Sequence, residues 1–481
     1  MFIVDWLQNP RIRRTIAASS VVLATGGLVL FRAPTASIAG IGITSHASGT
    51  QATFSGPGLH GSVALSHGAV LAGGERDVYA EVRLSADDVA THGEQRSPIA
   101  LAIALDTSGS MYGEKIEQAR NAILEIIRDM RDDDEIAVVR YSSSASVVQP
   151  LARLGDVRAS LNTQVRQLEA EGGTAIPLGL RAASKALEES GRGRVRRVVL
   201  VSDGLDSSRM ESEHLAHDSF EHGVTISSLG IGLDFDEAYM GAVARSGHGN
   251  FAFDKDGSVL ASFLQRELHE TASTTIEGAV VRVKMPHGMH FVSATGADAK
   301  VMDDDAVELR FGSLFAKDER RAVVHFTARL DPGETAQVAA VADWTQVLPG
   351  GSVPFVPAHV DVAAIALRGV TESKSVEDSR DGTVLASATS VIASERELEA
   401  AQAYTKGDVG RAQQLIDQNV KDLQAAATSA PAAAKPGLEK QWREYDATKT
   451  KFHAPPGSAG GQGAAKHAYE AEVKNLARPV Y

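Results

Sequence analysis

The chain has 481 residues, of which 43% are hydrophobic, carries a formal net charge of −13 and contains no cysteine. This length and composition suit two or three globular domains with sizeable cores. The acidic balance argues against nucleic-acid binding, which requires a basic surface, and the lack of cysteine excludes disulfides, zinc–thiolate sites, cysteine nucleophiles and a lipid-modified N-terminal cysteine.

Residues 1–40 have the pattern of an export signal, in which basic residues precede an apolar stretch. Arg11, Arg13 and Arg14 come before Thr15–Phe31, a run of 17 uncharged residues. As a helix this run would span about 25 Å, between a long signal-peptide core and a short membrane anchor. Either form would place the remaining chain outside the cytoplasm, anchored in the inner membrane and facing the periplasm or secreted, because the basic flank stays inside. The alternative is a buried helix of a soluble domain.

Residues 47–96 and 275–368 both have strand-like patterns separated by turns. The first segment contains short alternating runs such as Val78–Leu84, and the second contains several longer ones. The second segment predicts a β-sandwich. The earlier strands are too few to bury their own faces, so we predict that they complete this sandwich. Val78–Leu84 would then contact the strands that follow Ile276, and the domain between them would be an insertion.

Residues 97–274 alternate between apolar runs and amphipathic helices. Strands are predicted at Ile99–Leu105, Glu135–Tyr141, Val195–Ser202, Val224–Ile231 and Asn250–Phe253, and helices at Glu114–Met130, Asp156–Leu168, from Pro177 onward and at Ser258–Thr271. This alternation predicts an α/β fold with a doubly wound, mostly parallel sheet. In such folds ligands bind at the carboxyl edge of the sheet.

The C-terminal part is predicted to be helical. Residues 375–430 are rich in alanine, with helical periodicity and a break at Lys406–Asp408. They look like one tetratricopeptide-type unit, but a single copy favours a plain helical hairpin. Residues 431–481 are predicted to be a linker and tail, because prolines end the hairpin and Gly457–Gly463 is typical of a flexible segment before a short tail helix.

Polar residues gather around the ends of the predicted strands and in a glycine-rich loop. In chain order they are Asp106, Ser108, Ser110, Thr174 and Asp203. Three hard oxygens at alternate positions can converge in a tight turn, which glycine permits. Carboxylate and hydroxyl oxygens without nearby Cys or His select a hard divalent cation, with Mg²⁺ preferred and Mn²⁺ or Ca²⁺ as alternatives. The competing interpretation is that Asp106 caps the turn and the serines solvate a helix start.

This set of residues resembles the metal-ion-dependent adhesion site (MIDAS) of the von Willebrand factor type A (vWA) family. That site is written D-x-S-x-S, followed by a Thr and then an Asp, and all five elements occur in order. The resemblance covers about residues 97–274. It implies a vWA fold, a divalent cation bound by the five residues, and metal-bridged recognition of a protein.

A divalent cation at these residues would keep a position free for a ligand. Two carboxylates roughly neutralise the ion, and Mg²⁺ prefers six oxygens, so at least one position is left for water or an incoming group. An Asp or Glu carboxylate of a protein partner fits that position. The predicted function is therefore metal-dependent protein binding in a bacterial cell envelope, with membrane contact only through an uncleaved N-terminal segment.

The sequence offers no catalytic set. It contains no G-x-S-x-G elbow at a strand end, no H-E-x-x-H and no P-loop, so the chain is not predicted to be an enzyme. His214 and His217 share a helix face but lack a surrounding ligand set, which predicts exposed histidines. Two alternatives remain open: a helper subunit of an ATPase-linked assembly, as in some members of the family, and an envelope structural protein whose metal only stabilises the fold.

Overall fold

A computed structural model describes residues 43–88, 96–190, 193–204, 206–255, 258–303, 305–348 and 355–477. They belong to one compact unit, Gly42–Tyr481. The export signal predicted for residues 1–40 lies outside the described residues. Within the ranges given above, no helix combines the length and the apolar character needed to cross a lipid bilayer.

The α/β domain is built on a sheet whose described strands run in the order β11-β10-β9-β6-β7-β8. These are β6 (Ile99–Asp106), β7 (Glu135–Tyr141), β8 (Ala145–Arg153), β9 (Val195–Ser202), β10 (Val224–Ile231) and β11 (His248–Asp254). Neighbours are parallel except for the antiparallel pair β7 and β8. The predicted doubly wound sheet is confirmed. The edge strand β8 was not predicted, because only one of its nine residues is buried and it lacks a buried apolar run.

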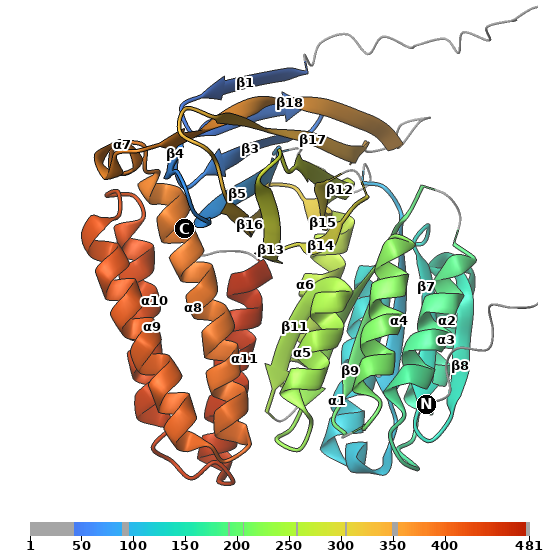
Figure 1. The fold of residues 1–481 in the computed structure, drawn as a ribbon. Coiled ribbons are helices and arrows are strands. Elements are labelled where there is room, and N and C mark those ends of the chain that lie inside the picture. The colour runs from blue at the N-terminus through green and yellow to red at the C-terminus, as the bar shows by residue number, and fades with distance from the viewer. Residues whose placement is uncertain are drawn as a thin grey trace, which may run out of the picture. The chain divides into compact units, whose positions relative to one another are not determined.

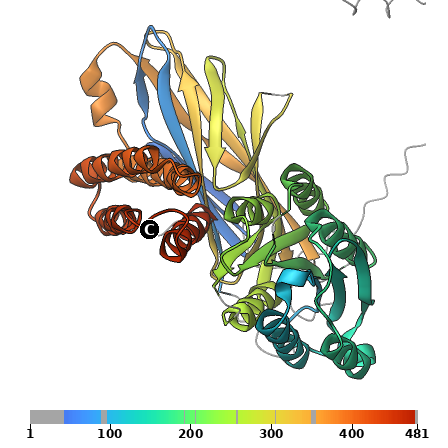
Figure 2. The same cartoon turned by 90° about the horizontal axis from the view of Figure 1, so that it is seen from below.

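Helices cover both faces of this sheet, as the view in Figure 2 shows. One face shares an apolar core with α1 (Glu114–Asp129), α2 (Leu154–Arg166) and α6 (Leu260–Ala272), and the other with α3 (Ile176–Glu188), α4 (Arg209–Glu221) and α5 (Glu237–Ser246). β6 and β10 are buried at every position. Strands covered on both faces are expected to be rich in apolar residues. β6 is an apolar run up to Asp106, whereas β10 also buries Thr225, Ser227 and Ser228.

Two further sheets form the β-sandwich (Figure 1). Their described strands run in the orders β1-β2-β3-β5-β16-β13 and β14-β15-β12-β17-β18-β4. The early strands are β1 (Thr44–Ser48), β2 (Gln51–Gly56), β3 (Leu59–Leu65), β4 (Ala69–Leu71) and β5 (Arg76–Ala86). The later strands are β12 (Thr274–Lys284), β13 (Met289–Thr295), β14 (Asp298–Val301), β15 (Ala306–Phe315), β16 (Glu319–Ala328), β17 (Thr335–Val347) and β18 (Phe355–Val370).

The sandwich is made from two segments that the α/β domain separates in the chain. β5 includes the predicted strand Val78–Leu84 and pairs antiparallel with β16, so the expected contact with the strands after Ile276 is present. The chain passes from β5 into β6 and returns from α6 into β12. The α/β domain is therefore inserted between two strands of the sandwich, as predicted.

The C-terminal region continues beyond a hairpin. After the short helix α7 (Ser373–Asp378), the predicted hairpin corresponds to α8 (Gly382–Thr405) and α9 (Val409–Ser429). The linker predicted between residues 431 and 463 is mostly helical in the structure, whereas the short tail helix predicted after Gly463 is present. α10 (Lys435–Lys451) packs on α9, and α11 (Ala459–Ala477) packs on α8. We call α8, α9, α10 and α11 the helical bundle (Figure 1).

The glycines predicted to form a flexible linker belong mainly to a helix. Gly461 lies in the first turn of α11, where a Cβ atom would overlap with Pro455 O and come within 2.6 Å of the Tyr404 hydroxyl oxygen. Glycine at this position permits close approach of two backbones rather than flexibility. Composition alone does not distinguish these two uses.

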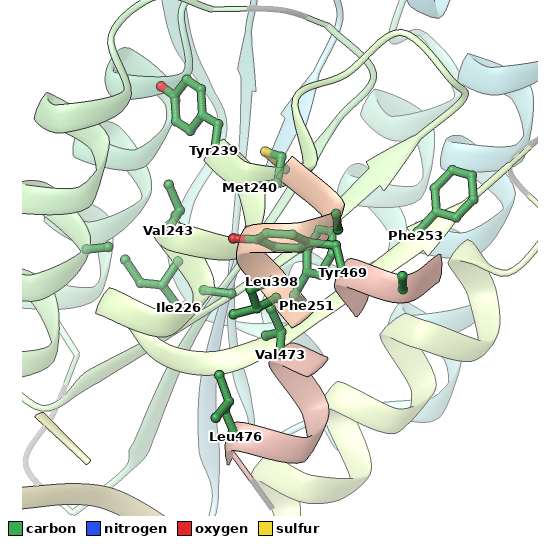
Figure 3. Packing of buried hydrophobic residues seen from close by; sticks show 14 of the residues in the cluster. Ile226, Tyr239, Met240, Val243, Phe251, Phe253, Leu398, Tyr469, Val473 and Leu476 are labelled. Carbon is green, nitrogen blue, oxygen red and sulfur yellow. The ribbon is translucent and has the colours of Figure 1, made fainter. Parts of the chain in front are cut away.

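The helical bundle packs on the α/β domain along α5 and β11. Tyr469 of α11 lies over Gly241, and its ring meets the Phe251 ring edge-on at a centroid distance of 6.0 Å (Figure 3). Lys466 Nζ donates to Glu237 Oε2 at 2.7 Å. Lys466 is only 3% exposed, and a buried ammonium requires such partners because its desolvation is costly. The contact thus combines an apolar core with a buried ion pair.

Candidate metal centre

Two adjacent parallel strands place two carboxylates at the same edge of the sheet. β6 ends at Asp106, and its neighbour β9 ends at Ser202, immediately before Asp203. The carboxyl ends of parallel strands meet at the edge where α/β folds bind ligands. Asp106 is 0% and Asp203 1% exposed, so each carboxylate needs compensating partners.

Asp106 accepts hydrogen bonds on both carboxylate oxygens. Ser108 N donates to Oδ1 at 2.8 Å and Ser202 Oγ donates to Oδ2 at 2.7 Å. Burial raises the pKa of Asp106 to about 6, although the hydrogen bonds from Ser202 and Ser108 oppose this rise, and the nearby charge of Asp203 adds to it. A cation beside this carboxylate would favour its charged form.

A chain of hydroxyl groups links this strand end to Asp203. Ser108 Oγ lies 3.0 Å from Ser110 Oγ, and Ser110 Oγ donates to Asp203 Oδ1 at 2.7 Å. The spacing comes from a single 3₁₀ turn, Gly109–Met111, which the buried Met111 side chain anchors. Ser110 is exposed, so this group of oxygens opens to solvent.

Thr174 reaches the same edge from the loop before α3. Backbone hydrogen bonds of 2.6 and 2.9 Å fix this loop to the turn that follows β6. Thr174 lies against Gly204, where a Cβ atom would overlap with the threonine hydroxyl oxygen. The structure therefore brings Thr174 next to the Asp203–Gly204 segment, and all five residues named from the sequence gather at one edge.

Two residues of this edge were not predicted. Lys115 Nζ contacts Asp203 Oδ2, and Ser202 holds Asp106. The available signals were modest: Lys115 lies in the first turn of the helix that follows the motif, and Ser202 is a polar residue that ends an otherwise apolar run. Neither signal indicates which carboxylate the residue contacts.

The donor chemistry fits a hard divalent cation. The five residues supply two carboxylates and three hydroxyls, without imidazole or thiolate. Across the described ranges no group of three or more His, Cys, Asp and Glu is arranged to hold a metal, so a cation at this edge would need the hydroxyl oxygens as well. Carboxylate and hydroxyl oxygens suit Mg²⁺, Mn²⁺ and Ca²⁺.

The histidines of α4 form no comparable site. His217 Nε2 lies 3.8 Å from a Glu221 oxygen and its Nδ1 lies 3.8 Å from an Asp298 oxygen, with the imidazole 40% exposed. His214 is exposed. These are surface contacts between weakly interacting groups.

Sequence comparisons identify similar proteins for part of the chain. Residues 100–266 match the family model described as the von Willebrand factor type A domain. An uncharacterized protein of Synechocystis sp. is 25% identical over 278 residues, covering 54% of this chain and 64% of that protein. Inter-alpha-trypsin inhibitor heavy chain H2 of Mus musculus is 26% identical over 171 residues, covering 32% of this chain and 17% of the heavy chain. The chain thus matches less than two thirds of the length of either relative.

Solved structures resemble a larger part of the chain. A von Willebrand factor type A protein from Catenulispora acidiphila is 18% identical with a TM-score of 0.68, covering 88% of this chain and 97% of that one. The ArnB paralog VWA2 from Sulfolobus acidocaldarius is 14% identical with a TM-score of 0.56, covering 88% and 98%. These likenesses show a shared fold that extends beyond residues 100–266.

Proposed function

Because residues 100–266 form a von Willebrand factor type A domain, a kind of domain that commonly mediates protein–protein interactions, we propose that the protein binds a partner protein through a divalent cation, preferably Mg²⁺. The residues that would hold the ion are Asp106, Ser108, Ser110, Thr174 and Asp203. The observation that carries this proposal is the hydrogen-bonded chain from Ser108 through Ser110 to Asp203, which gathers hard oxygens at a solvent-facing edge.

Each group has a separate task in this function. The two aspartates supply the negative charge, and the hydroxyls supply neutral oxygens. Ser110 donates its proton to Asp203 and accepts from the Ser108 hydroxyl, so one lone pair of its oxygen remains to face the cation. The bound ion would supply an open coordination position for an Asp or Glu carboxylate of the partner. Binding of this kind activates no nucleophile, and the proposed role is non-enzymatic.

Exposed apolar side chains near this edge support a protein as the partner. Tyr112 is 82% exposed and follows Ser110 by two residues. Leu178, 37% exposed, and Met210, 73% exposed, lie in the first turns of α3 and α4, which begin beside Thr174 and shortly after Asp203. Large apolar side chains in solvent are typical of protein-binding surfaces, and a rim of them would bury area around a central carboxylate.

The proposed location is the cell envelope. Its support is the N-terminal order of three arginines followed by an uncharged stretch to Phe31. A reporter active only outside the cytoplasm, fused after Phe31, should be active. A reporter that stays cytoplasmic would contradict export and favour a helper subunit of an ATPase-linked assembly.

The function is tested by partner capture with the immobilised protein. Wild type and Asp106→Ala are incubated with envelope extract in Mg²⁺ or in EDTA, and one portion of extract first has its carboxylates blocked with a carbodiimide and an amine. We expect wild type to retain a partner only in Mg²⁺ and only from unblocked extract, and Asp106→Ala to retain none. The matched control is Asp156→Ala, which removes an exposed aspartate at the opposite edge of the sheet.

The outcomes separate the alternatives. Retention of the same partner in EDTA would contradict the role of the metal. A rise in the melting temperature of wild type with Mg²⁺, without any metal-dependent partner, would instead indicate a structural envelope protein whose ion stabilises the fold.

A further inference from the structure

A lysine contacts one of the two carboxylates of the candidate metal centre. Lys115 Nζ contacts Asp203 Oδ2, while Ser110 Oγ donates to Asp203 Oδ1 at 2.7 Å. The Asp203 side chain is fully buried and that of Lys115 is 25% exposed. Both oxygens of Asp203 are therefore engaged, one by a hydroxyl and one by a fixed positive charge.

The backbone at the neighbouring strand end leaves room for this ammonium. Gly232 directly follows β10 at the same edge, and a Cβ atom there would lie 3.1 Å from Lys115 Nζ. The lysine thus has a defined place among the loops of the site and does not simply extend into solvent.

The lysine changes the charge that a bound cation would meet. Asp106 and Asp203 together carry two negative charges, and Lys115 offsets one of them. With a divalent ion added, the group would carry a net charge of one positive unit instead of none. A site with surplus positive charge holds the ion less tightly by itself and attracts an additional carboxylate more strongly.

We infer that Lys115 sets the balance between ion binding and partner binding: its ammonium weakens the affinity of the site for Mg²⁺ alone and strengthens the capture of an external carboxylate once the ion is bound. This inference rests on the proposed function and concerns the regulation of the same site. It assigns a positioning and charge-setting role to a residue outside the D-x-S-x-S, Thr and Asp set. It predicts that the ion would depend on its partner for full occupancy.

The test measures metal affinity without a protein partner. Full-length wild type, Lys115→Met, Lys115→Gln and Lys115→Arg are titrated with Mg²⁺ by calorimetry. We expect the two neutral variants to bind Mg²⁺ about tenfold more tightly than wild type, since one repelling charge is removed, and Lys115→Arg to stay close to wild type. The control is Lys185→Met, which removes an exposed lysine of α3 and should leave the affinity unchanged.

A second titration uses acetate as the probe for the open position. Adding acetate should tighten Mg²⁺ binding several-fold in wild type and in Lys115→Arg, and much less in Lys115→Met. A merely structural role for Lys115 would not produce these opposite changes in ion affinity and acetate coupling. Thermal melting of each variant shows whether it is folded, and Lys115→Gln replaces Lys115→Met if the latter does not fold.

The failure of this inference differs from the failure of the proposed function. If wild type binds Mg²⁺ and Asp106→Ala does not, but the neutral Lys115 variants bind no more tightly than wild type, only the role of Lys115 is overturned. If wild type, Asp106→Ala and the Lys115 variants all show the same binding, or none at millimolar Mg²⁺, the metal site itself is wrong and both conclusions fall.

Discussion

Two buried acids of the α/β domain, Asp203 and Glu237, differ from two inside the helical bundle, Glu397 and Glu472, in how their charge is compensated. Asp203 contacts Lys115, and Glu237 accepts from Lys466 Nζ at 2.7 Å. Glu397 and Glu472 of the bundle are 1% and 3% exposed, and in the described residues neither pairs with a lysine or arginine. A buried acid beside an ammonium stays charged, whereas one among neutral groups is shifted towards its protonated form.

The interior of the bundle favours this protonated form. Burial raises the pKa of Glu397 to about 8, and the proximity of Glu472 adds to the rise. Burial likewise raises the pKa of Glu472 to about 7. Glu472 Oε2 accepts from the Tyr445 hydroxyl at 2.8 Å, and Glu397 Oε1 has no hydrogen-bond partner among the described residues. The comparison shows that buried carboxylates serve charge-dependent contacts at Asp203 and Glu237 and neutral packing at Glu397 and Glu472.

The largest expected effect comes from removing a cation from a paired acid. Lys466→Met leaves the Glu237 carboxylate buried and unpaired, and should lower the free energy of unfolding by about 3–5 kcal/mol. Lys466→Met combined with Glu237→Gln should recover most of this loss, because no charge remains buried. Urea denaturation of both variants measures the difference.

A surface lysine on the same helix provides the control for that experiment. Lys474 pairs with Glu470 but is 50% exposed, so Lys474→Met should cost less than about 1 kcal/mol. Equal losses in the free energy of unfolding for Lys466→Met and Lys474→Met, or no recovery in the double variant, would contradict the claim that Glu237 needs its lysine partner.

The next effect is a pH dependence from the bundle acids. Folding raises the pKa of Glu397 to about 8 and of Glu472 to about 7 from 4.5, so the folded state binds more protons than the unfolded state. Their stabilising contribution is fully present below pH 4.5 and is lost as the pH rises through 7 and 8. The double variant Glu397→Gln, Glu472→Gln should remove this part of the pH dependence, on the order of 2 kcal/mol between pH 7 and 9.

The measurement is the difference between wild type and this double variant across the pH range. Other groups titrate in both proteins, so their contributions to stability cancel in the difference. One of them is His248, whose pKa burial lowers to about 3, so its contribution to stability rises with pH instead of falling. If the two stability curves run parallel from pH 5 to pH 9, the two glutamates are not neutral in the folded bundle.

The parts of the fold that could be predicted are those where local sequence and tertiary environment agree. Glu135–Tyr141, Val195–Ser202 and Val224–Ile231 were assigned with the bounds that the structure has. Each is mostly buried because helices cover both faces of the sheet, and each contains apolar β-branched residues that indicate a strand. α10 was missed for the opposite reason: it is strongly polar and buries few side chains, so its packing on α9 determines its helical state.

The candidate metal centre shows the same division. Motif spacing was enough to select Asp106, Ser108 and Ser110, because the end of β6 and the turn that follows it hold all three. The contact between Lys115 and Asp203 depends on the rotation of α1 and on the position of a strand end 88 residues later in the chain. No local sequence pattern indicates that Lys115 and Asp203 are in contact, so the charge balance of the site could be derived only from the structure.

The smallest predicted effect concerns the packing of Thr174 at the metal centre. Gly204 is not among the positive-φ glycines, so alanine is compatible with its backbone, but a Cβ atom there would overlap with the Thr174 hydroxyl. Gly204→Ala should therefore displace Thr174 and weaken Mg²⁺ binding about tenfold while the protein stays folded. Calorimetric titration measures this change.

A double-mutant cycle shows whether the effect of Gly204→Ala passes through Thr174. In a Thr174→Ala background the hydroxyl is already absent, so adding Gly204→Ala should have little further effect on Mg²⁺ affinity. Additive losses would mean that Gly204→Ala disturbs the site through the Asp203 backbone instead. If Thr174→Ala alone leaves Mg²⁺ affinity unchanged, Thr174 loses its place among the proposed ligands, and the hydroxyl supply would come from Ser108 and Ser110 alone, the two groups that the turn after β6 already positions.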